Sequence, residues 1–206
     1  MLEDFFNNLR ITEPALKEEI YKYATITEHD KGDVIIRNNE YIKVLKIILD
    51  GKIRVYQRNE SREILIYYLF SMETCTLSLA ACFEECQSNV GAITEEKTTI
   101  LNIPVRFAKE WNFKYKSWNN FTINTFRKSY TYLIEEYASL AFKPLKNRLL
   151  DYLVWESDEA VVYRSHQELA NELGTTREVI SRLLKKLEKD NKLQLGKKEI
   201  ILLETE

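Results

Sequence analysis

The sequence has few of the residues that characterise disulfide-rich, metal-binding or catalytic proteins. It contains three cysteines and two histidines in 206 residues. Cys75, Cys82 and Cys86 lie in one short stretch, and an odd number so placed is a poor disulfide framework for a secreted domain. His29 and His166 belong to no recognisable set of metal ligands or catalytic groups. We therefore expect reduced thiols, no metal site and no enzymatic activity.

Long apolar runs are also missing. No segment approaches the roughly 20 apolar residues that a membrane span requires. The first ten residues, MLEDFFNNLR, lack the basic-then-apolar order of a secretory signal. These features predict a cytoplasmic location and no contact with a membrane.

The first half of the chain changes from helical to β-rich patterning. Residues 1–22 predict a short helix with a break at Glu13-Pro14. Between about Thr25 and Pro104, turn signals separate short apolar runs, and Asp50-Gly51 between two such runs predicts a hairpin. The runs are VII at 34–36, VLKIIL at 44–49, KIRVY at 52–56, ILIYYL at 64–69 and TTILNI at 98–103. We expect an all-β sandwich or roll.

A long helix at 116–140 is predicted within the segment after Pro104, because residues 105–140 contain no glycine or proline. Apolar side chains recur there at alternating spacings of three and four, which is typical of a coiled-coil seam. They are Ile123, Phe126, Tyr130, Leu133, Tyr137 and Leu140. The stripe predicts pairing with the same helix of a second copy; the alternative is that it packs on its own β domain.

A second, smaller domain is expected after Lys143-Pro144, since proline suits the first turn of a new helix. The predicted organisation is α+β. It comprises a β-roll at 1–115, a dimerisation helix at 116–140 and a small C-terminal domain at 141–206.

The segment from Ser165 to Leu193 has the spacing of a helix-turn-helix. Ser165 and Glu168 form a capping box at the start of the first helix. Gly174 supplies the left-handed turn, and Thr175 or Thr176 caps the second helix. The inward residues of that helix are Ile180, Leu183, Leu184 and Leu187.

The outer face of the second helix carries groups suited to DNA bases. Arg177, Glu178, Ser181 and Arg182 face outward near the end that enters a major groove in helix-turn-helix proteins, with Lys185 one turn further on. Arginine can bond two guanine acceptors, glutamate can accept from cytosine, and serine suits either partner. Alternatively, Glu178 only closes a capping box with Thr175, and the charges only solvate the helix.

The local charge near the C-terminus favours binding to DNA. The whole chain has a net charge of −2, but eight basic and three acidic residues between Gly174 and Lys198 give that segment +5. Two short strands around Gly196-Lys197-Lys198 predict a wing with both lysines at its tip, placed to contact phosphates.

This layout resembles the Crp/Fnr superfamily of regulators over nearly the whole chain. The most specific match is QELANELGTTREVISRLLKKLEKDNKL, and softer matches are KGDVIIRNNE at 31–40 and ILDGKIRVY at 48–56. The resemblance implies that the β-roll at 1–115 is a sensor domain and that 141–206 is a winged helix-turn-helix DNA-binding domain. It also implies a homodimer on a pseudo-palindromic operator, with RNA polymerase as a further partner. It assigns base reading to Arg177, Glu178, Ser181 and Arg182, and a phosphate contact to Thr176.

The sensor region departs from the relatives that bind cyclic nucleotides. Ser88-Asn89 stands where an Arg-Ser pair would hold the cyclic phosphate, and Thr76-Leu77 stands near the place of a Gly-Glu pair. A buried phosphate without its arginine would lack a charge partner. We expect no ordinary cyclic AMP binding and no cofactor, and the effector is not specified.

The cysteines permit two interpretations. They can act as small buried hydrophobes, or Cys82 and Cys86 can form a redox switch at helical i, i+4 spacing. The family's iron-sulfur sensors use four cysteines, mostly near the N-terminus, which this chain lacks. A sensor module whose winged domain binds a protein is the alternative to a DNA-binding regulator.

Overall fold

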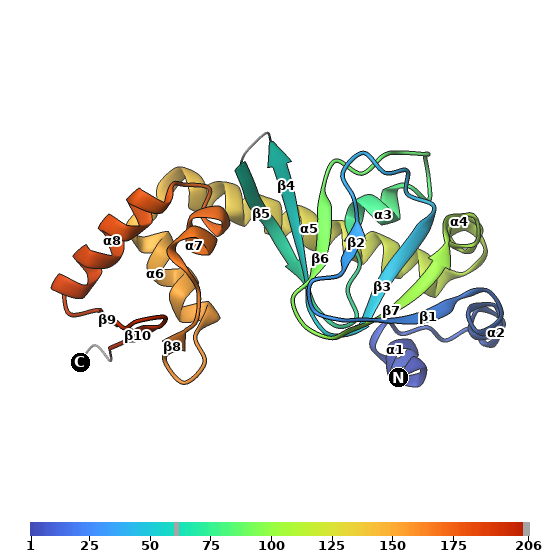
Figure 1. Ribbon diagram of the computed structural model, residues 1–206. Coiled ribbons are helices and arrows are strands. Elements are labelled where there is room, and N and C mark those ends of the chain that lie inside the picture. Colours follow the sequence, from blue (N-terminus) through green and yellow to red (C-terminus); the bar gives the residue numbers. More distant parts are fainter. Residues whose placement is uncertain (60–61, 204–206) are drawn as a thin grey trace. The chain divides into compact units, whose positions relative to one another are not determined.

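The chain folds as two units, and one long helix contributes residues to both (Figure 1). The computed structural model describes residues 1–59 and 62–203. One unit comprises residues 1–58 and 66–133, and the other comprises 59–65 and 134–206.

The first unit begins with two short helices, α1 (Leu2–Asn8) and α2 (Pro14–Tyr23). The break at Glu13-Pro14 is confirmed, because Pro14 occupies the first helical position of α2. Seven strands and two helices follow: β1 (Thr25–His29), β2 (Val34–Ile36), β3 (Val44–Asp50), β4 (Ile53–Asn59), β5 (Arg62–Leu69), α3 (Thr76–Ala80), β6 (Gly91–Thr94), β7 (Thr98–Pro104) and α4 (Val105–Lys114). The last residue of β4 and the first four residues of β5 are grouped with the second unit.

The strands form two sheets with the orders β1-β7-β3 and β2-β6-β4-β5. Side chains from both sheets share one core, in which Ile48 and Ile100 meet Ile53, Val55 and Ala92. This arrangement confirms the β-rich domain predicted from the sequence. β1 and β6 had not been predicted individually; β1 is polar and mostly exposed, so it lacks an alternating apolar pattern.

The hairpin predicted at Asp50-Gly51 is wrong. β3 and β4 belong to different sheets, and this turn carries the chain from one sheet to the other. Gly51 has a φ of 103°, and a Cβ there would lie 2.5 Å from Thr98 Oγ1 and 2.8 Å from the Lys97 carbonyl oxygen. The glycine is therefore needed for a close crossing beside the start of β7.

Helices cover the outer face of the β1-β7-β3 sheet. Alternation along the strands turns Ile47 and Leu101 away from the core between the sheets and toward these helices. Trp111 of α4 and Trp118 of the next helix are fully buried there, with ring centroids 5.1 Å apart in an edge-to-face arrangement.

The long helix α5 (Lys116–Phe142) begins in this core. Its first turns bury Trp118 and Phe121, whereas its later residues are mostly exposed. None of the helices in residues 1–59 and 62–203 combines the length and apolarity that a membrane crossing requires.

Two carboxylates of the α2 region tie it to α4 and α5. Glu13 accepts hydrogen bonds from the Ser117 backbone N–H at 3.0 Å and from the Ser117 hydroxyl. Glu19 accepts from Trp111 Nε1, Lys114 Nζ and the Tyr115 hydroxyl. Partial burial would raise the pKa of Glu13, but the bonds from Ser117 outweigh it and lower the pKa to about 2.

The second unit is a winged helix-turn-helix. It contains α6 (Leu145–Glu156), β8 (Val161–Val162), α7 (His166–Glu172), α8 (Arg177–Lys189), β9 (Leu193–Leu195) and β10 (Ile200–Leu202). The strands form an antiparallel sheet in the order β8-β10-β9. The helices and the two wing strands were predicted; the two-residue β8 was not, because it is too short to show a period.

The Glu13 bonds predict a pH-dependent contribution to stability. The pKa of Glu13 is below its unfolded value of 4.5, so the stabilisation is present above pH 4.5 and is lost as the pH falls toward 2. We expect Glu13→Gln to lower the free energy of unfolding at pH 7 by about 1 kcal/mol, a typical helix-cap contribution. Denaturant unfolding of both proteins between pH 7 and pH 3 measures this.

The difference between the two proteins should shrink over that pH range. Glu18→Gln, on the exposed side of α2, is the matched control and should leave the pH profile of wild type unchanged. A Glu13→Gln difference that stays constant down to pH 3 would contradict the assigned bonds.

Candidate nucleic-acid interface

The helix α8 has one buried side and one charged side. Ile180, Leu184 and Leu187 are fully buried in the core of the second unit. Arg177, Glu178, Arg182 and Lys185 are exposed, and Ser181 is partly exposed beside them. The 3.6-residue period of the helix separates the two sets.

The caps that position α8 are local. Ser165 and Glu168 form the predicted capping box at the start of α7, and Gly174 has a φ of 65° in the turn between the helices. Thr176 caps α8, its hydroxyl oxygen accepting from the Val179 N–H at 3.4 Å. The interpretation that Glu178 closes a box with Thr175 is therefore wrong, since the third residue after the cap is Val179.

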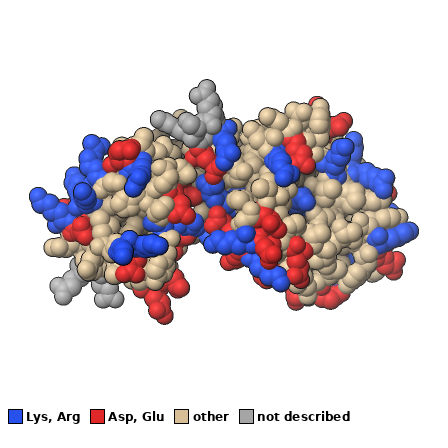
Figure 2. All heavy atoms as spheres, viewed as in Figure 1, with Lys and Arg blue, Asp and Glu red and all other residues tan. Residues whose placement is uncertain are grey.

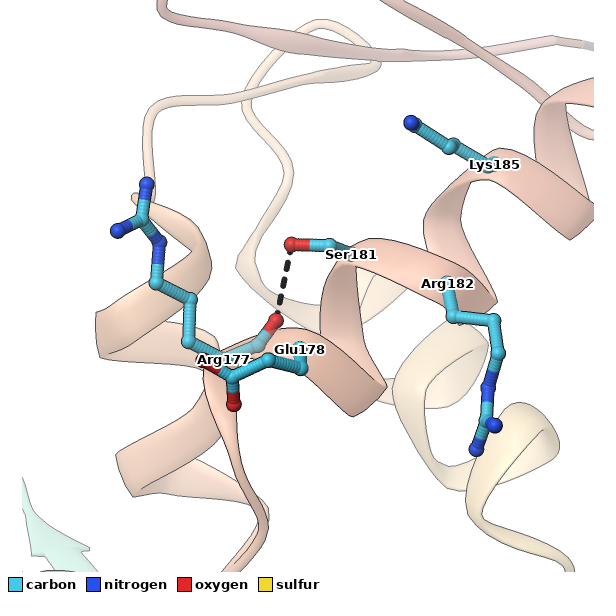
Figure 3. A pocket seen from close by; sticks show the side chains of 5 residues that line it. All are labelled: Arg177, Glu178, Ser181, Arg182 and Lys185. Carbon is cyan, nitrogen blue, oxygen red and sulfur yellow. Dashed lines mark hydrogen bonds between the residues drawn. The ribbon is translucent and has the colours of Figure 1, made fainter.

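The four residues predicted to read bases lie together. With Lys185, they line an open hollow of about 560 Å³ on the surface of α8 (Figure 3). Their contact with DNA bases stays a prediction.

Glu178 is held in its ionised form. Hydrogen bonds from its own backbone N–H and from the Thr176 hydroxyl lower the pKa of Glu178, and the nearby Arg177 charge adds to the effect. An ionised carboxylate only accepts hydrogen bonds, so this position suits an amino group on a base edge. The Thr176 hydroxyl already serves the cap and Glu178, and its contact with phosphate stays a prediction.

His166 belongs to this face, which the sequence did not indicate. Its Nδ1 lies 2.8 Å from Ser181 Oγ, and that hydroxyl also donates to the Arg177 carbonyl oxygen at 2.9 Å. Burial lowers the pKa of His166, and the charges of Arg177 and Lys185 lower it further. The two residues are 15 positions apart on different helices, so no local pattern could have paired them.

Basic side chains extend the face toward the wing. Lys and Arg gather at the end of the second unit that carries α8 (Figure 2). Lys197 and Lys198 are exposed in the turn between β9 and β10. The Glu188 carboxylate of α8 accepts from the Leu195 backbone N–H at 2.9 Å, which ties the wing to α8.

The predicted seam on α5 is exposed in the single chain. The exposed fraction is 63% for Leu133 and 72% for Tyr137, and Ile123 and Tyr130 are more than half exposed. Phe126 is partly covered, with its ring centroid 6.4 Å from that of Phe83. Most of this apolar stripe therefore does not pack against the domain that precedes it.

The cysteines are free thiols, and the helical spacing assumed for Cys82 and Cys86 is wrong. α3 ends at Ala80, so the two do not lie on successive turns of one helix. Cys82 is fully buried, and burial, with the neighbouring Cys86, raises the pKa of its thiol to about 12. Cys86 is partly exposed. A redox role for this pair stays a prediction.

In the β-roll, the residues that replace the cyclic-nucleotide ligands of the relatives form hydrogen bonds within the protein. Ser88 is buried, and its hydroxyl donates to the Val90 carbonyl oxygen at 2.8 Å and accepts from the Val90 N–H at 3.3 Å. Thr76 begins α3 and donates to Ser129 Oγ of α5 at 3.3 Å. The expected absence of cyclic AMP binding stays a prediction. In residues 1–59 and 62–203, no cluster of three His, Cys, Asp or Glu side chains could hold a metal ion.

Comparisons with known proteins identify the second unit and the fold. The family model for the Crp-like helix-turn-helix domain matches residues 147–206. A Crp/Fnr-family transcriptional regulator from Eubacterium rectale has a similar structure, with 25% identity, a TM-score of 0.87, and coverage of 98% of this chain and 95% of that chain. No curated protein matches the sequence.

Two further solved structures share the fold at lower identity. The c-di-GMP-responsive global regulator CLP from Xanthomonas campestris is 20% identical, with a TM-score of 0.79 and coverage of 94% of this chain and 100% of that chain. A CRP/FNR-family regulator from Thermus thermophilus is 18% identical, with a TM-score of 0.68 and coverage of 87% and 94%.

The burial of the thiols predicts their order of reactivity. We expect a maleimide at pH 7.5 to modify Cys86 first and Cys82 at least about tenfold more slowly, because a buried thiol with a raised pKa forms little accessible thiolate. Peptide mass mapping over time measures both rates, and labelling in denaturant is the control in which all three thiols react. Equal native rates for Cys82 and Cys86 would contradict the burial.

Proposed function

Since the chain has the fold of the Crp/Fnr-family transcriptional regulators and a Crp-like helix-turn-helix DNA-binding domain, we propose that it binds a pseudo-palindromic operator as a homodimer. A signal received at the β-roll controls this binding. The observation that carries the proposal is the outer face of α8, where Arg177, Glu178, Ser181 and Arg182 line one open hollow.

Each side chain of that face suits one feature of the major groove. Arg177 and Arg182 can each bond the O6 and N7 acceptors of a guanine. The ionised Glu178 accepts from the N4 amino group of cytosine, and Ser181 adds a short polar contact beside it. If the chain follows the family's pattern of base contacts, Arg182 and Glu178 together specify one G·C pair in each half-site.

Phosphate contacts would set orientation without reading sequence. Lys185 follows the base-reading residues on α8, and Lys197 and Lys198 extend from the wing. Thr176 at the start of α8 completes this set. Such contacts supply the affinity that all sequences share, and they weaken as salt rises.

The exposed seam of α5 is the proposed dimer contact. Ile123, Phe126, Tyr130, Leu133 and Tyr137 repeat at coiled-coil spacing, and a second copy would bury them. A two-fold dimer presents two α8 helices to successive major grooves about 34 Å apart. The β-roll signal would act by favouring or disfavouring that spacing.

RNA polymerase is the expected protein partner, and the cytoplasm, where bacterial DNA lies, is the expected location. The alternative, in which the winged domain binds a protein, is not favoured, because the outer face of α8 is charged and the matched domain is of the Crp-like helix-turn-helix type.

Selection of bound duplexes from a random pool tests the function directly. We expect a symmetric consensus with half-site centres about one DNA turn, 10–10.5 base pairs, apart. Against the selected duplex, Arg182→Ala should cost on the order of 1–3 kcal/mol and relax one position, whereas Lys197→Ala should weaken all sequences alike.

These two variants control for each other, since each removes one exposed cation from the second unit. The base-reading assignment fails if Arg182→Ala weakens every duplex equally. The function itself fails if the pool yields no enriched sequence.

A charge placed on the α5 seam should separate the protomers. We expect Leu133→Asp to convert the dimer to a monomer in sedimentation, because the carboxylate would be buried without a partner, and to weaken operator binding together with it. Asn124→Asp adds the same charge on the opposite side of α5, where the side chain is exposed, and should leave the dimer intact. Dissociation by both variants, or by neither, would contradict the assigned seam.

A further inference from the structure

The Ser181 hydroxyl has two hydrogen-bond partners inside the protein. Its oxygen lies 2.9 Å from the Arg177 carbonyl oxygen one turn earlier on α8, and 2.8 Å from His166 Nδ1 on α7 (the first of these bonds is drawn in Figure 3). Ser181 also lines the hollow that carries the proposed base-reading residues.

Counting protons fixes the direction of both bonds. A hydroxyl has one hydrogen and two lone pairs, and a carbonyl oxygen only accepts. The Ser181 hydrogen is therefore used on Arg177, and Ser181 can meet His166 only by accepting from an Nδ1–H group. If the imidazole carried its proton on Nε2 instead, one hydrogen would have to serve both Nδ1 and the carbonyl, and one of the two contacts would not be a bond.

We propose that His166 is a positioning residue that holds the Ser181 hydroxyl as a pure hydrogen-bond acceptor toward DNA. The inference rests on the proposed DNA-binding function and adds a specificity to it. One lone pair of Ser181 stays available, so the hydroxyl pairs with an amino group, the N6 of adenine or the N4 of cytosine. It does not pair with the guanine N7 and O6 or the thymine O4 atoms, which are acceptors.

The arrangement does not depend on the charge of His166. The charged groups that face it are Arg177 and Lys185, both on α8, and together with burial they favour the neutral imidazole. The neutral Nδ1–H tautomer and the protonated ring both donate from Nδ1, so Ser181 accepts in either state.

The tautomer can be measured without DNA. The sequence has two histidines, so a His29→Gln variant leaves His166 as the single imidazole in the ¹⁵N NMR spectrum of the full chain. At pH 8 we expect Nδ1 to show the shift of a protonated nitrogen and Nε2 that of an unprotonated one. The opposite pattern would overturn the inference whatever DNA the protein binds.

The Ser181→Ala variant first identifies the base position that Ser181 reads, as the position at which this variant loses its preference. Competition between duplexes that differ only at that position then measures the base preference. Each base pair presents one amino group in the major groove, so we expect the wild type to lose this preference when that group is removed, by purine in place of adenine or by pyrimidin-2-one in place of cytosine. His166→Phe keeps a ring but no donor, and should reduce this preference about three- to tenfold, the equivalent of one hydrogen bond, with discrimination at other positions unchanged.

His166→Asn is the rescue variant, because its amide nitrogen lies one bond from Cγ, as Nδ1 does, and should restore the preference. Gln167→Ala is the matched control; this neighbouring α7 side chain bonds Asn171 and should have no effect. A Ser181-dependent preference that survives removal of that amino group, or an unchanged preference in His166→Phe, would overturn the inference while leaving DNA binding itself established. If the wild-type protein selects no duplex, both the proposed function and the proposed base contact are contradicted.

Discussion

The packing of the inner side of α8 determines which groups the protein can offer to DNA. Ile180, Leu184 and Leu187 are fully buried, and removing each of them from water contributes about 1.5–3 kcal/mol. A rotation of α8 by one residue, about 100°, would expose these side chains and turn charged groups toward the core. The register of the helix is therefore fixed, and with it the outward direction of Arg177 and Arg182.

The caps and the wing act on the same helix. Thr176 fixes where α8 begins, and Glu188 ties its later turns to β9. Within this frame the hydrogen-bond chain from His166 through Ser181 to Arg177 adds a finer constraint, because it determines the direction of a single hydroxyl hydrogen. Affinity and specificity would thus come from different parts of one small domain, with lysines for the backbone and the outer face of α8 for the bases.

The helix-turn-helix could be predicted from the sequence because its determinants are local. Ser165 and Glu168 are three residues apart, and the inward residues of α8 repeat at helical spacing. Pairings between distant segments could not be predicted in the same way. Asp50-Gly51 has the local signature of a hairpin, yet the positive φ of Gly51 serves a crossing between sheets beside Thr98. The bond between Glu13 and Ser117 joins residues 104 positions apart, and the contact of His166 with Ser181 depends on how two helices cross.

The long helix α5 is the element through which a signal at the β-roll would reach the DNA-binding domain. Its first turns are fixed by Trp118 and Phe121 in the core of the first unit and by the bonds of Ser117 to Glu13. Further along, the same helix exposes the apolar seam. A change in the β-roll core would therefore act on the helix that also carries the proposed dimer contact.

The central claim is that the basic outer face of α8 and the wing bind duplex DNA. The dependence of DNA affinity on salt concentration tests this claim most directly. Fluorescence anisotropy with a labelled duplex, from about 50 to 200 mM salt, gives the slope of log K against log [salt]. Counterion release predicts a linear and steep fall, by about 0.9 in slope for each phosphate neutralised. An affinity that does not change with salt, or no measurable affinity at 50 mM, would contradict the account.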